Sequence, residues 1–291
     1  MSEIAYFNGE FLPKEEIRIS PDDRGFLFAD GVYDVALSYG GNFFRMDAHL
    51  TRLANGLRAL EIVGVDVPSL AGVAHELLRR NGAASGDRAV YFQVTRGAAP
   101  RKHAFPVASV QPTVYATTMP FVRKGDPTEG TSVITVPDTR WTRCDIKSIG
   151  LIPNCMANQR AHAAGATEAI FIKDGVALEG TAASFFAVFD GVVTTAPNSN
   201  YILPGITRAA VLEICTNAGI PSREAPVFAA DLWSADELFL AGTTTEVLSI
   251  IRLDGRDVGD GRPGPMVKRL VGLFHELVAR ECSVTPAELS A

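Results

Sequence analysis

The sequence lacks an excess of positive charge, and it lacks long hydrophobic runs. Its 291 residues include 27 Lys and Arg against 33 Asp and Glu, which gives a formal net charge of −6 at pH 7. A nucleic-acid-binding protein needs a basic face, so this composition argues against nucleic acid as a partner. No apolar run approaches the roughly 20 residues of a membrane span, and residues 1–4 have none of the features of a signal peptide. We therefore expect no membrane partner and a cytoplasmic location.

Cysteine and histidine are also scarce. The four cysteines and five histidines are scattered, with no Cys-x-x-Cys pair and no spacing typical of metal ligands. We interpret the cysteines as reduced thiols of a cytoplasmic protein and predict no metal site. Hydrophobic residues make up 47% of the chain, enough for substantial cores, and the length fits two domains.

Lysine is scarce as well, and one of the six lysines differs from the others. Five lie beside charged, turn, proline or glycine residues, where solvent is expected. Lys147 lies among Ile146, Ile149, Leu151 and Ile152, which predicts an apolar environment. Burial disfavours a charged ammonium group, and a neutral amine is a nucleophile suited to Schiff-base formation with a carbonyl. The alternative is a lysine at a helix start whose ammonium group extends into solvent.

Alternating and helical patterns predict a mixture of strands and helices. Asn8-Gly9 predicts a hairpin turn, and three Asp-Gly pairs predict further turns in the second half. Helices are predicted over 46–62, 70–79, 151–164, 207–217 and 265–281. Strands are predicted over 88–96, 112–119, 132–136, 237–241 and 247–253. Hairpins mixed with helices predict an α+β fold with an N-terminal domain over 1–119, a linker at 120–127 and a C-terminal domain over 128–291.

The segment 203–208, Leu-Pro-Gly-Ile-Thr-Arg, predicts a turn that leads into a helix. Free backbone N–H groups and the helix dipole favour an anion at such a point. Thr207 would add a hydroxyl donor, and Arg52 or Arg208 would add a positive charge. The alternative is an ordinary connection between a strand and a helix.

Two more segments have suitable polar groups. Glu179 lies at the end of an apolar strand, where its carboxylate would suit a protonated heteroaromatic nitrogen, unless it is simply an exposed glutamate. The hydroxyls of 242–246, Gly-Thr-Thr-Thr-Glu, suit either phosphate contacts or a plain turn. Together with Lys147, these groups match the needs of pyridoxal 5′-phosphate (PLP), which is held as a lysine Schiff base with an acidic partner on its pyridine nitrogen.

Longer blocks of residues resemble a known family. The blocks lie at 6–9, 23–33, 49–53, 91–97, 143–148, 179–181, 205–208 and 261–265. In these blocks the chain resembles fold-type IV, class IV PLP-dependent aminotransferases nearly end to end, and among them the bacterial D-amino-acid transaminases. The order and spacing of the blocks carry the resemblance, since a motif such as Glu-Gly-Thr alone would be weak. The resemblance implies the two-domain α+β architecture of fold type IV.

The resemblance also implies a role for each matching residue. Lys147 is expected to form the Schiff base and to move a proton between Cα and the cofactor C4′. Glu179 is expected to pair with the pyridine nitrogen, Leu203 to pack on the ring face, and Tyr33 to line the substrate pocket. The phosphate is expected to bind Arg52, Ile206, Thr207 and Thr243, with Ile206 and Thr207 contributing backbone N–H groups.

A smaller motif, Arg101-Lys102-His103, favours D-amino acids within that family. In the D-amino-acid enzymes an Arg-x-His on this loop reaches the active site of the partner subunit and, with a tyrosine matching Tyr33, binds the substrate α-carboxylate. Arginine makes a fixed, bidentate contact with a carboxylate. A contact on one side of the cofactor decides which Cα–H faces the lysine, and so fixes the handedness of the substrate. The alternative for these residues is a solvated basic loop.

The resulting hypothesis is a homodimeric D-amino-acid transaminase with a shared active site. It would move the amino group of D-amino acids such as D-alanine to 2-oxoglutarate or pyruvate by a ping-pong route. The alternatives are a branched-chain L-amino-acid aminotransferase, an (R)-amine transaminase and aminodeoxychorismate lyase. A non-catalytic binding protein is disfavoured, because both Lys147 and Glu179 are present. The chain departs from the D-amino-acid enzymes at Ser184, where asparagine is usual, and at Gly242, where serine is usual, and we expect binding and rate to change more than reaction type.

Overall fold

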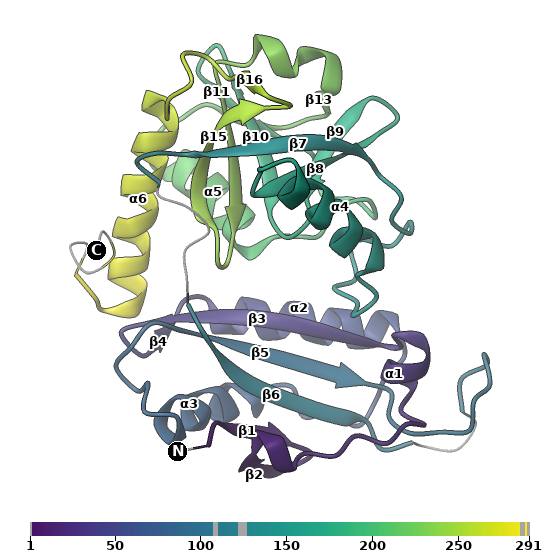
Figure 1. The fold of residues 1–291 in the computed structure, drawn as a ribbon. Coiled ribbons are helices and arrows are strands. Elements are labelled where there is room, and N and C mark those ends of the chain that lie inside the picture. Colours follow the sequence, from purple (N-terminus) through teal and green to yellow (C-terminus); the bar gives the residue numbers. More distant parts are fainter. Residues whose placement is uncertain (1, 107–109, 122–126, 286–288, 290–291) are drawn as a thin grey trace. The chain divides into compact units, whose positions relative to one another are not determined.

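The computed structural model describes residues 2–106, 110–121, 127–285 and 289, which belong to two compact units (Figure 1). Unit 1 comprises Met1–Phe121 and two later segments, Ile146–Gly150 and Glu281–Val284. Unit 2 comprises Val122–Asp145, Leu151–Arg280 and Thr285–Ala291. The domain boundaries predicted from the sequence stay a prediction, and residues 122–126 of the predicted linker lie outside the described residues.

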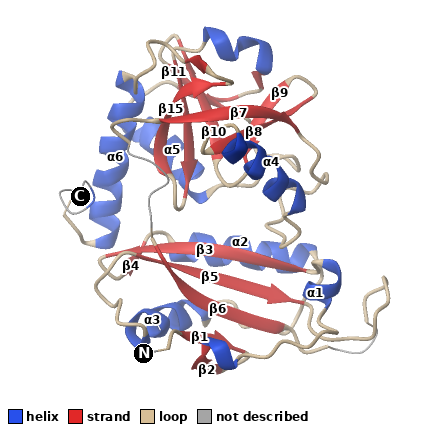
Figure 2. Ribbon diagram, in the orientation of Figure 1, coloured by secondary structure: helices blue, strands red, loops and turns tan. Residues whose placement is uncertain are grey.

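Unit 1 is a six-stranded sheet in the order β2-β1-β6-β5-β3-β4, with antiparallel neighbours throughout. Its strands are β1 (Ile4–Phe7), β2 (Glu10–Pro13), β3 (Gly31–Tyr39), β4 (Asn42–Phe43), β5 (Arg88–Thr95) and β6 (Thr113–Pro120). Its helices are the 3-10 turn η1 (Lys14–Glu16), α1 (Arg24–Phe28), α2 (Met46–Ala59) and α3 (Leu70–Arg80). Figure 2 shows α2 and α3 behind the sheet, and both contribute to one core with the residues of that face.

The alternation of residues along the strands defines the two faces of this sheet. On β5, Val90, Phe92 and Val94 are buried, whereas Tyr91 and Gln93 are partly exposed. This period-two pattern is typical of an antiparallel sheet with one covered face. The buried side chains pack against α2 and α3, so the opposite face presents tyrosine and polar side chains.

Unit 2 is built on a ten-stranded sheet. Its strands are β7 (Thr131–Pro137), β8 (Glu168–Lys173), β9 (Val176–Gly180), β10 (Ser184–Phe189), β11 (Val192–Thr195), β12 (Ser222–Glu224), β13 (Val227–Phe228), β14 (Glu237–Gly242), β15 (Glu246–Leu253) and β16 (Arg256–Asp257). Its helices are α4 (Ile152–Ala163), α5 (Ile206–Asn217), the 3-10 helix η2 (Ala229–Ser234) and α6 (Pro265–Cys282). The path β10-β14-β15-β7-β8-β9 closes on itself, because β9 also pairs with β10 through Glu179 and Ser184. Closure leaves these six strands without open edges.

Most predicted elements agree with the observed ones, and the differences concern one helix end and several elements that were not predicted. The Asn8-Gly9 hairpin is confirmed, and both residues have positive φ, as a two-residue hairpin turn requires. The helix predicted over 46–62 ends at Ala59, because Glu61 has a φ of 55° and terminates it. The sequence did not predict α1 or β3, and β3 is a central strand that carries Tyr33.

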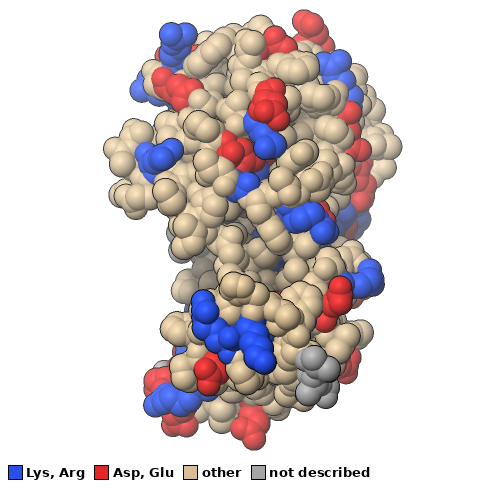
Figure 3. Space-filling model, turned by 90° about the vertical axis from the view of Figure 1, so that its right-hand side faces the viewer, with Lys and Arg blue, Asp and Glu red and all other residues tan. Residues whose placement is uncertain are grey.

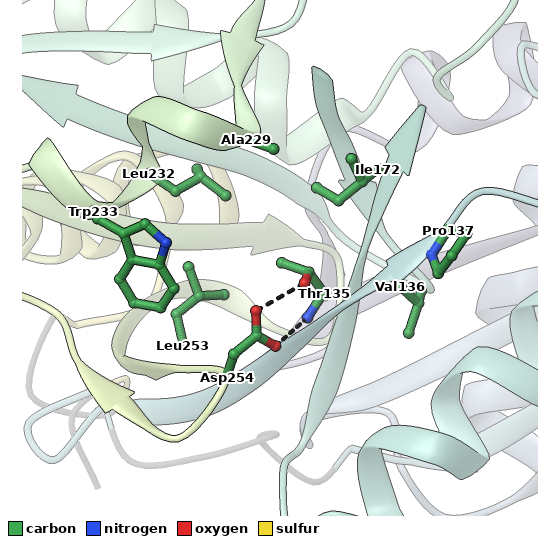
Figure 4. Close-up of a pocket in the computed structure, with 9 residues that line it drawn as sticks. All are labelled: Thr135, Val136, Pro137, Ile172, Ala229, Leu232, Trp233, Leu253 and Asp254. Atoms are coloured by element: carbon green, nitrogen blue, oxygen red, sulfur yellow. Dashed lines mark hydrogen bonds between the residues drawn. The ribbon is translucent and has the colours of Figure 1, made fainter. Parts of the chain in front are cut away.

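The surface carries charged side chains of both signs among uncharged ones. On the face drawn in Figure 3, Lys, Arg, Asp and Glu are scattered among uncharged residues, and one group of Lys and Arg side chains lies together in the lower part. None of the described helices has the length and apolar character to cross a membrane. Within the described residues, no group of three or more His, Cys, Asp or Glu side chains is placed to hold a metal ion.

Candidate active site

Lys147 lies on a short segment that pairs with β3 of unit 1. The segment forms an antiparallel bridge with the strand. The Tyr33 N–H donates to Lys147 O at 3.0 Å, and the Ile149 N–H donates to Gly31 O at 3.1 Å. Glycine is required at position 31, since a Cβ there would lie 2.5 Å from a backbone oxygen of β5. These contacts fix the backbone of Lys147 on the sheet of unit 1.

The side chain of Lys147 is partly buried, whereas the sequence predicted burial. The difference follows from the course of the segment, which bends at Ile146 and again at Ile149, with the Ser148 N–H donating to Ile146 O at 2.8 Å. Ile146 is buried in the core of unit 1, so Lys147 points away from that core, and Ile152 is 71% exposed. Lys147 Nζ lies 4.4 Å from the ring centroid of Tyr33, a cation–π contact. Tyr33 in turn stacks on Tyr91 with ring centroids 5.6 Å apart.

A buried ion-pair cluster connects α2 to β3 beside this segment. Arg52 Nε and Nη2 donate to the two carboxylate oxygens of Asp34 at 2.8 Å each, and His49 Nδ1 lies 2.8 Å from Asp34 Oδ1. Burial favours the neutral acid, but the charge and hydrogen bonds of Arg52, with those of His49, hold the pKa of Asp34 well below its ordinary value. Burial lowers the pKa of His49, and the charges of Arg52 and Lys147 act in the same direction, against Asp34. Arg52 is therefore held in one orientation.

Glu179 is buried in unit 2 and has two polar partners. Arg140 Nη1 forms a short ion pair with Glu179 Oε1, and the Leu203 N–H donates to Glu179 Oε2 at 3.1 Å. Arg140 also pairs with Asp138 at 2.8 Å and lies 4.2 Å from the ring centroid of Phe171. Burial disfavours the charged guanidinium, but the hydrogen bonds and charges of Asp138 and Glu179 raise the pKa of Arg140. The structure thus brings Glu179 and Leu203 together, and their predicted roles stay a prediction.

Ser184 connects Glu179 to the start of α5. It pairs with Glu179 across β9 and β10, and a Cβ on Gly205 would lie 2.6 Å from Ser184 Oγ. Gly205 is the N-cap of α5 and, having no side chain, makes no capping hydrogen bond to the first turn. That turn begins with Ile206 and the buried Thr207, so its backbone N–H groups are available for an anion from outside the helix.

Thr243 lies in the turn between β14 and β15. Ala241, two residues earlier, pairs with Ser184 on β10, so this turn follows directly from the strand next to Ser184. Gly242 ends β14, and a Cβ there would meet only ordinary van der Waals contacts at 3.4 Å. A lack of space for a side chain therefore does not explain the glycine at this position.

Arg101 and His103 are exposed on a loop of unit 1. The Arg101 guanidinium carbon lies 5.1 Å from the ring centroid of Phe28, and the His103 ring lies 5.7 Å from the same ring. The two residues are thus brought together on one aromatic side chain of α1. Within the described residues of unit 1, no hydrogen bond or ring contact joins Arg101 or His103 to Tyr33.

Sequence reasoning missed the partners of the predicted residues. Asp34 on β3, Arg140 in the loop after β7 and Arg24 at the start of α1 are all buried or nearly so and all pair with charged groups. Asp34 could have been found from the sequence, because it is a charged residue that lies between the apolar Val32 and Ala36 on one face of its strand.

Comparison with known proteins assigns the family. The family model of amino-transferase class IV matches residues 31–253. The chain is 36% identical to the D-alanine aminotransferase of Staphylococcus haemolyticus over 280 residues, which is 96% of this chain and 99% of that protein. It is 38% identical to the D-alanine aminotransferase of Bacillus licheniformis over 96% of this chain and 98% of that protein. The protein belongs to the class IV aminotransferases.

Solved structures agree with this assignment. The branched-chain amino acid aminotransferase of Escherichia coli superposes with a TM-score of 0.89 at 24% identity, over 97% of this chain and 96% of that one. The branched-chain aminotransferase of Thermoproteus uzoniensis superposes with a TM-score of 0.86 at 26% identity, over 97% and 96%. The predicted α+β, fold-type IV class is therefore confirmed. The family membership also confirms the prediction of a PLP-dependent aminotransferase.

The residues of the structure fit PLP. Unit 1 supplies a partly buried lysine whose backbone is fixed on a strand, and an arginine oriented by a buried carboxylate. Unit 2 supplies a buried carboxylate with a cationic partner, and the first turn of a twelve-residue helix that has no side-chain cap. An aldehyde, a pyridine nitrogen and a phosphate require groups of these kinds.

Proposed function

We propose that the protein is a D-amino-acid transaminase that moves the amino group of D-amino acids such as D-alanine to 2-oxo acids. The observation that carries the choice of substrate is the loop with Arg101 and His103, both exposed and both in contact with Phe28. An arginine on an ordered loop suits bidentate binding of an α-carboxylate. The full-length similarity to D-alanine aminotransferases supports the same choice.

Each residue then has a defined task. Lys147 would hold the cofactor through its Nζ, and the same Nζ would act as the base that takes the proton from the substrate Cα. Bound PLP supplies an electron sink that stabilises the negative charge left on Cα. A negatively charged Glu179 would keep a proton on the pyridine nitrogen. The Arg140 guanidinium stabilises the negative charge of Glu179. Leu203 contacts the ring face.

The phosphate would be held by two backbone N–H groups and by two side chains. The N–H groups of Ile206 and Thr207 donate from the first turn of α5, where the helix dipole favours an anion. Thr243 adds a hydroxyl, and Arg52 adds a positive charge whose direction is set by Asp34. Because Arg52 is already oriented, it loses little rotamer freedom when the phosphate binds.

The same proposal includes a homodimer in the cytoplasm, in which Arg101 and His103 act at the active site of the partner subunit while Tyr33 lines the substrate pocket. Their exposure in the single chain supports this arrangement. Light scattering after size exclusion is expected to give twice the mass of 31.1 kDa. An active monomer would contradict the role of the loop in a partner subunit.

The test of the reaction is a set of half-reactions with the purified, PLP-loaded enzyme. D-alanine, L-leucine and (R)-1-phenylethylamine are mixed with it separately, and the long-wavelength absorption of the cofactor is followed. Rapid loss of this absorption with D-alanine alone is expected. Loss with L-leucine instead would assign a branched-chain aminotransferase, and rapid loss with the amine would show that a carboxylate is not required.

A further inference from the structure

The exposed loop that carries Arg101 and His103 is fixed by a buried side chain from another part of unit 1. Arg24 Nη1 donates to Lys102 O at 2.6 Å, and Arg24 Nη2 donates to His103 O at 3.4 Å. Arg24 is 3% exposed and is the first residue of α1, 78 residues before Lys102. The backbone of the Arg-x-His motif is therefore bonded at two successive carbonyl groups to one buried guanidinium.

The guanidinium of Arg24 is itself held in one orientation, because it pairs with the carboxylate of Asp30. Arg24 Nε donates to Asp30 Oδ2 at 2.7 Å, and Arg96 donates to both oxygens of Asp30 at 2.7 and 3.0 Å. Arg96 also donates to Leu60 O and Glu61 O at the end of α2, at 2.6 and 3.1 Å. Burial favours neutral Asp30, but the hydrogen bonds and charges of Arg96 and Arg24 lower its pKa. The cluster thus ties the loop to the helical layer of unit 1.

Phe28, at the other end of α1, supports the side chains of the motif. Its ring centroid lies 4.8 Å from the guanidinium carbon of Arg24 and 5.1 Å from that of Arg101. The ring of His103 lies 5.7 Å away, with 71° between the planes, an edge-to-face contact. One partly buried ring therefore contacts both members of the motif and the arginine that holds their backbone. Such contacts restrict side chains that would otherwise sample many rotamers.

We infer that Arg24 and Phe28 are positioning residues that pre-order Arg101 and His103 for a substrate α-carboxylate. The inference rests on the proposed function, in which Arg101 and His103 bind that carboxylate. Arg24 fixes the loop backbone, and Phe28 restricts the two side chains. An arginine that is ordered before binding loses less conformational freedom on binding, so the device lowers KM for amino acids. Substrates without a carboxylate gain nothing from it.

The kinetic test uses the PLP-loaded enzyme and the variants Arg24→Gln and Phe28→Leu. The KM for D-alanine is expected to rise about tenfold or more in Arg24→Gln, the loss of roughly one charge-assisted hydrogen bond, with a smaller change in kcat. The rate with (R)-1-phenylethylamine, which has no carboxylate, is expected to stay within about threefold of its wild-type value. Arg45→Gln is the matched control, since Arg45 pairs with Glu281 at 3.1 Å and contacts Phe44 instead of the loop. Equal losses with both substrates would overturn the inference in favour of a general structural role.

Amide hydrogen exchange separates this inference from the proposed function. The amides of residues 101–105 are expected to exchange faster in Arg24→Gln than in the wild type, and at the wild-type rate in Arg45→Gln. Unchanged exchange, or faster exchange with an unchanged KM, would overturn the inference. A wild-type enzyme that does not react with D-alanine would overturn the proposed function alone, and the KM comparison is then made with the amino acid that the enzyme accepts.

Discussion

Replacing Asp34 with asparagine is expected to destabilise unit 1 strongly while hardly changing the volume of the side chain. Asp34 is fully buried and accepts two hydrogen bonds from Arg52 and one from His49, all at 2.8 Å. Asparagine is neutral and replaces one acceptor oxygen with an NH2 donor. Arg52, only 8% exposed, would then lose the carboxylate with which it forms its ion pair.

The size of the effect follows from these contacts. Removing one partner of a buried ion pair costs about 3–5 kcal/mol, because the other charge stays buried and unpaired. The two bonds from Arg52 to Asp34, at about 1.5–3 kcal/mol for each hydrogen bond to a charged group, give a similar sum. The free energy of unfolding of unit 1 is therefore expected to fall by about 3–5 kcal/mol in Asp34→Asn.

The assay is urea unfolding of the cofactor-free protein followed by far-ultraviolet circular dichroism. Fluorescence is unsuitable, since both tryptophans, Trp141 and Trp233, belong to unit 2. The double variant Asp34→Asn/Arg52→Met is expected to lose much less than the sum of the two single variants, because it removes both charges. A loss below about 1 kcal/mol in Asp34→Asn, or additive losses, would refute the view that this ion pair holds α2 on β3.

Three further outcomes are expected. The melting temperature should fall as the pH drops below about 6.5 and again below about 4. The folded-state pKa values of His49 and Asp34 lie below the ordinary 6.5 and 3.8, so the unfolded chain binds more protons than the folded chain in these ranges. A melting temperature that does not change with pH would contradict this. Gly205→Ala should weaken PLP retention on dialysis, because its Cβ would lie 2.6 Å from Ser184 Oγ, and Ser184→Ala should restore part of it. Cys155 should be the one thiol that reacts rapidly with Ellman's reagent, since it alone is exposed and burial raises the pKa of the other three to about 11 or 12.

Local patterns predicted the parts of the fold whose causes are local. The Asn8-Gly9 turn and the helices over 70–80 and 152–163 follow from turn chemistry and periodicity within a few residues. Helix α1 has five residues, too few to show a helical period. Strand β3 was missed because the buried Asp34 interrupts its apolar face, and Arg52 and His49 of α2, which bond to its carboxylate, make that burial tolerable.

The position of Lys147 shows a second limit. Its sequence neighbours predicted an apolar pocket, but of these neighbours Ile146 alone enters the core of unit 1. The pairing that decides this joins residues more than 110 positions apart, and no pattern near Lys147 records it. The motif marked the residue as a candidate, whereas its environment depends on a strand from the other end of the chain.

The charged residues of the site share one arrangement that motifs do not reveal. Asp34 orients Arg52, Arg140 pairs with Glu179, and Arg24 holds the loop of Arg101. In each case the residue expected to contact a ligand lies in a recognisable motif, while its supporting charge lies 18, 39 or 78 residues away along the chain. A charge that is already paired and oriented needs little reorganisation when the ligand arrives, which favours both affinity and rate. Substitutions at the supporting residues are therefore expected to change binding even though none of these residues belongs to the predicted set of ligand contacts.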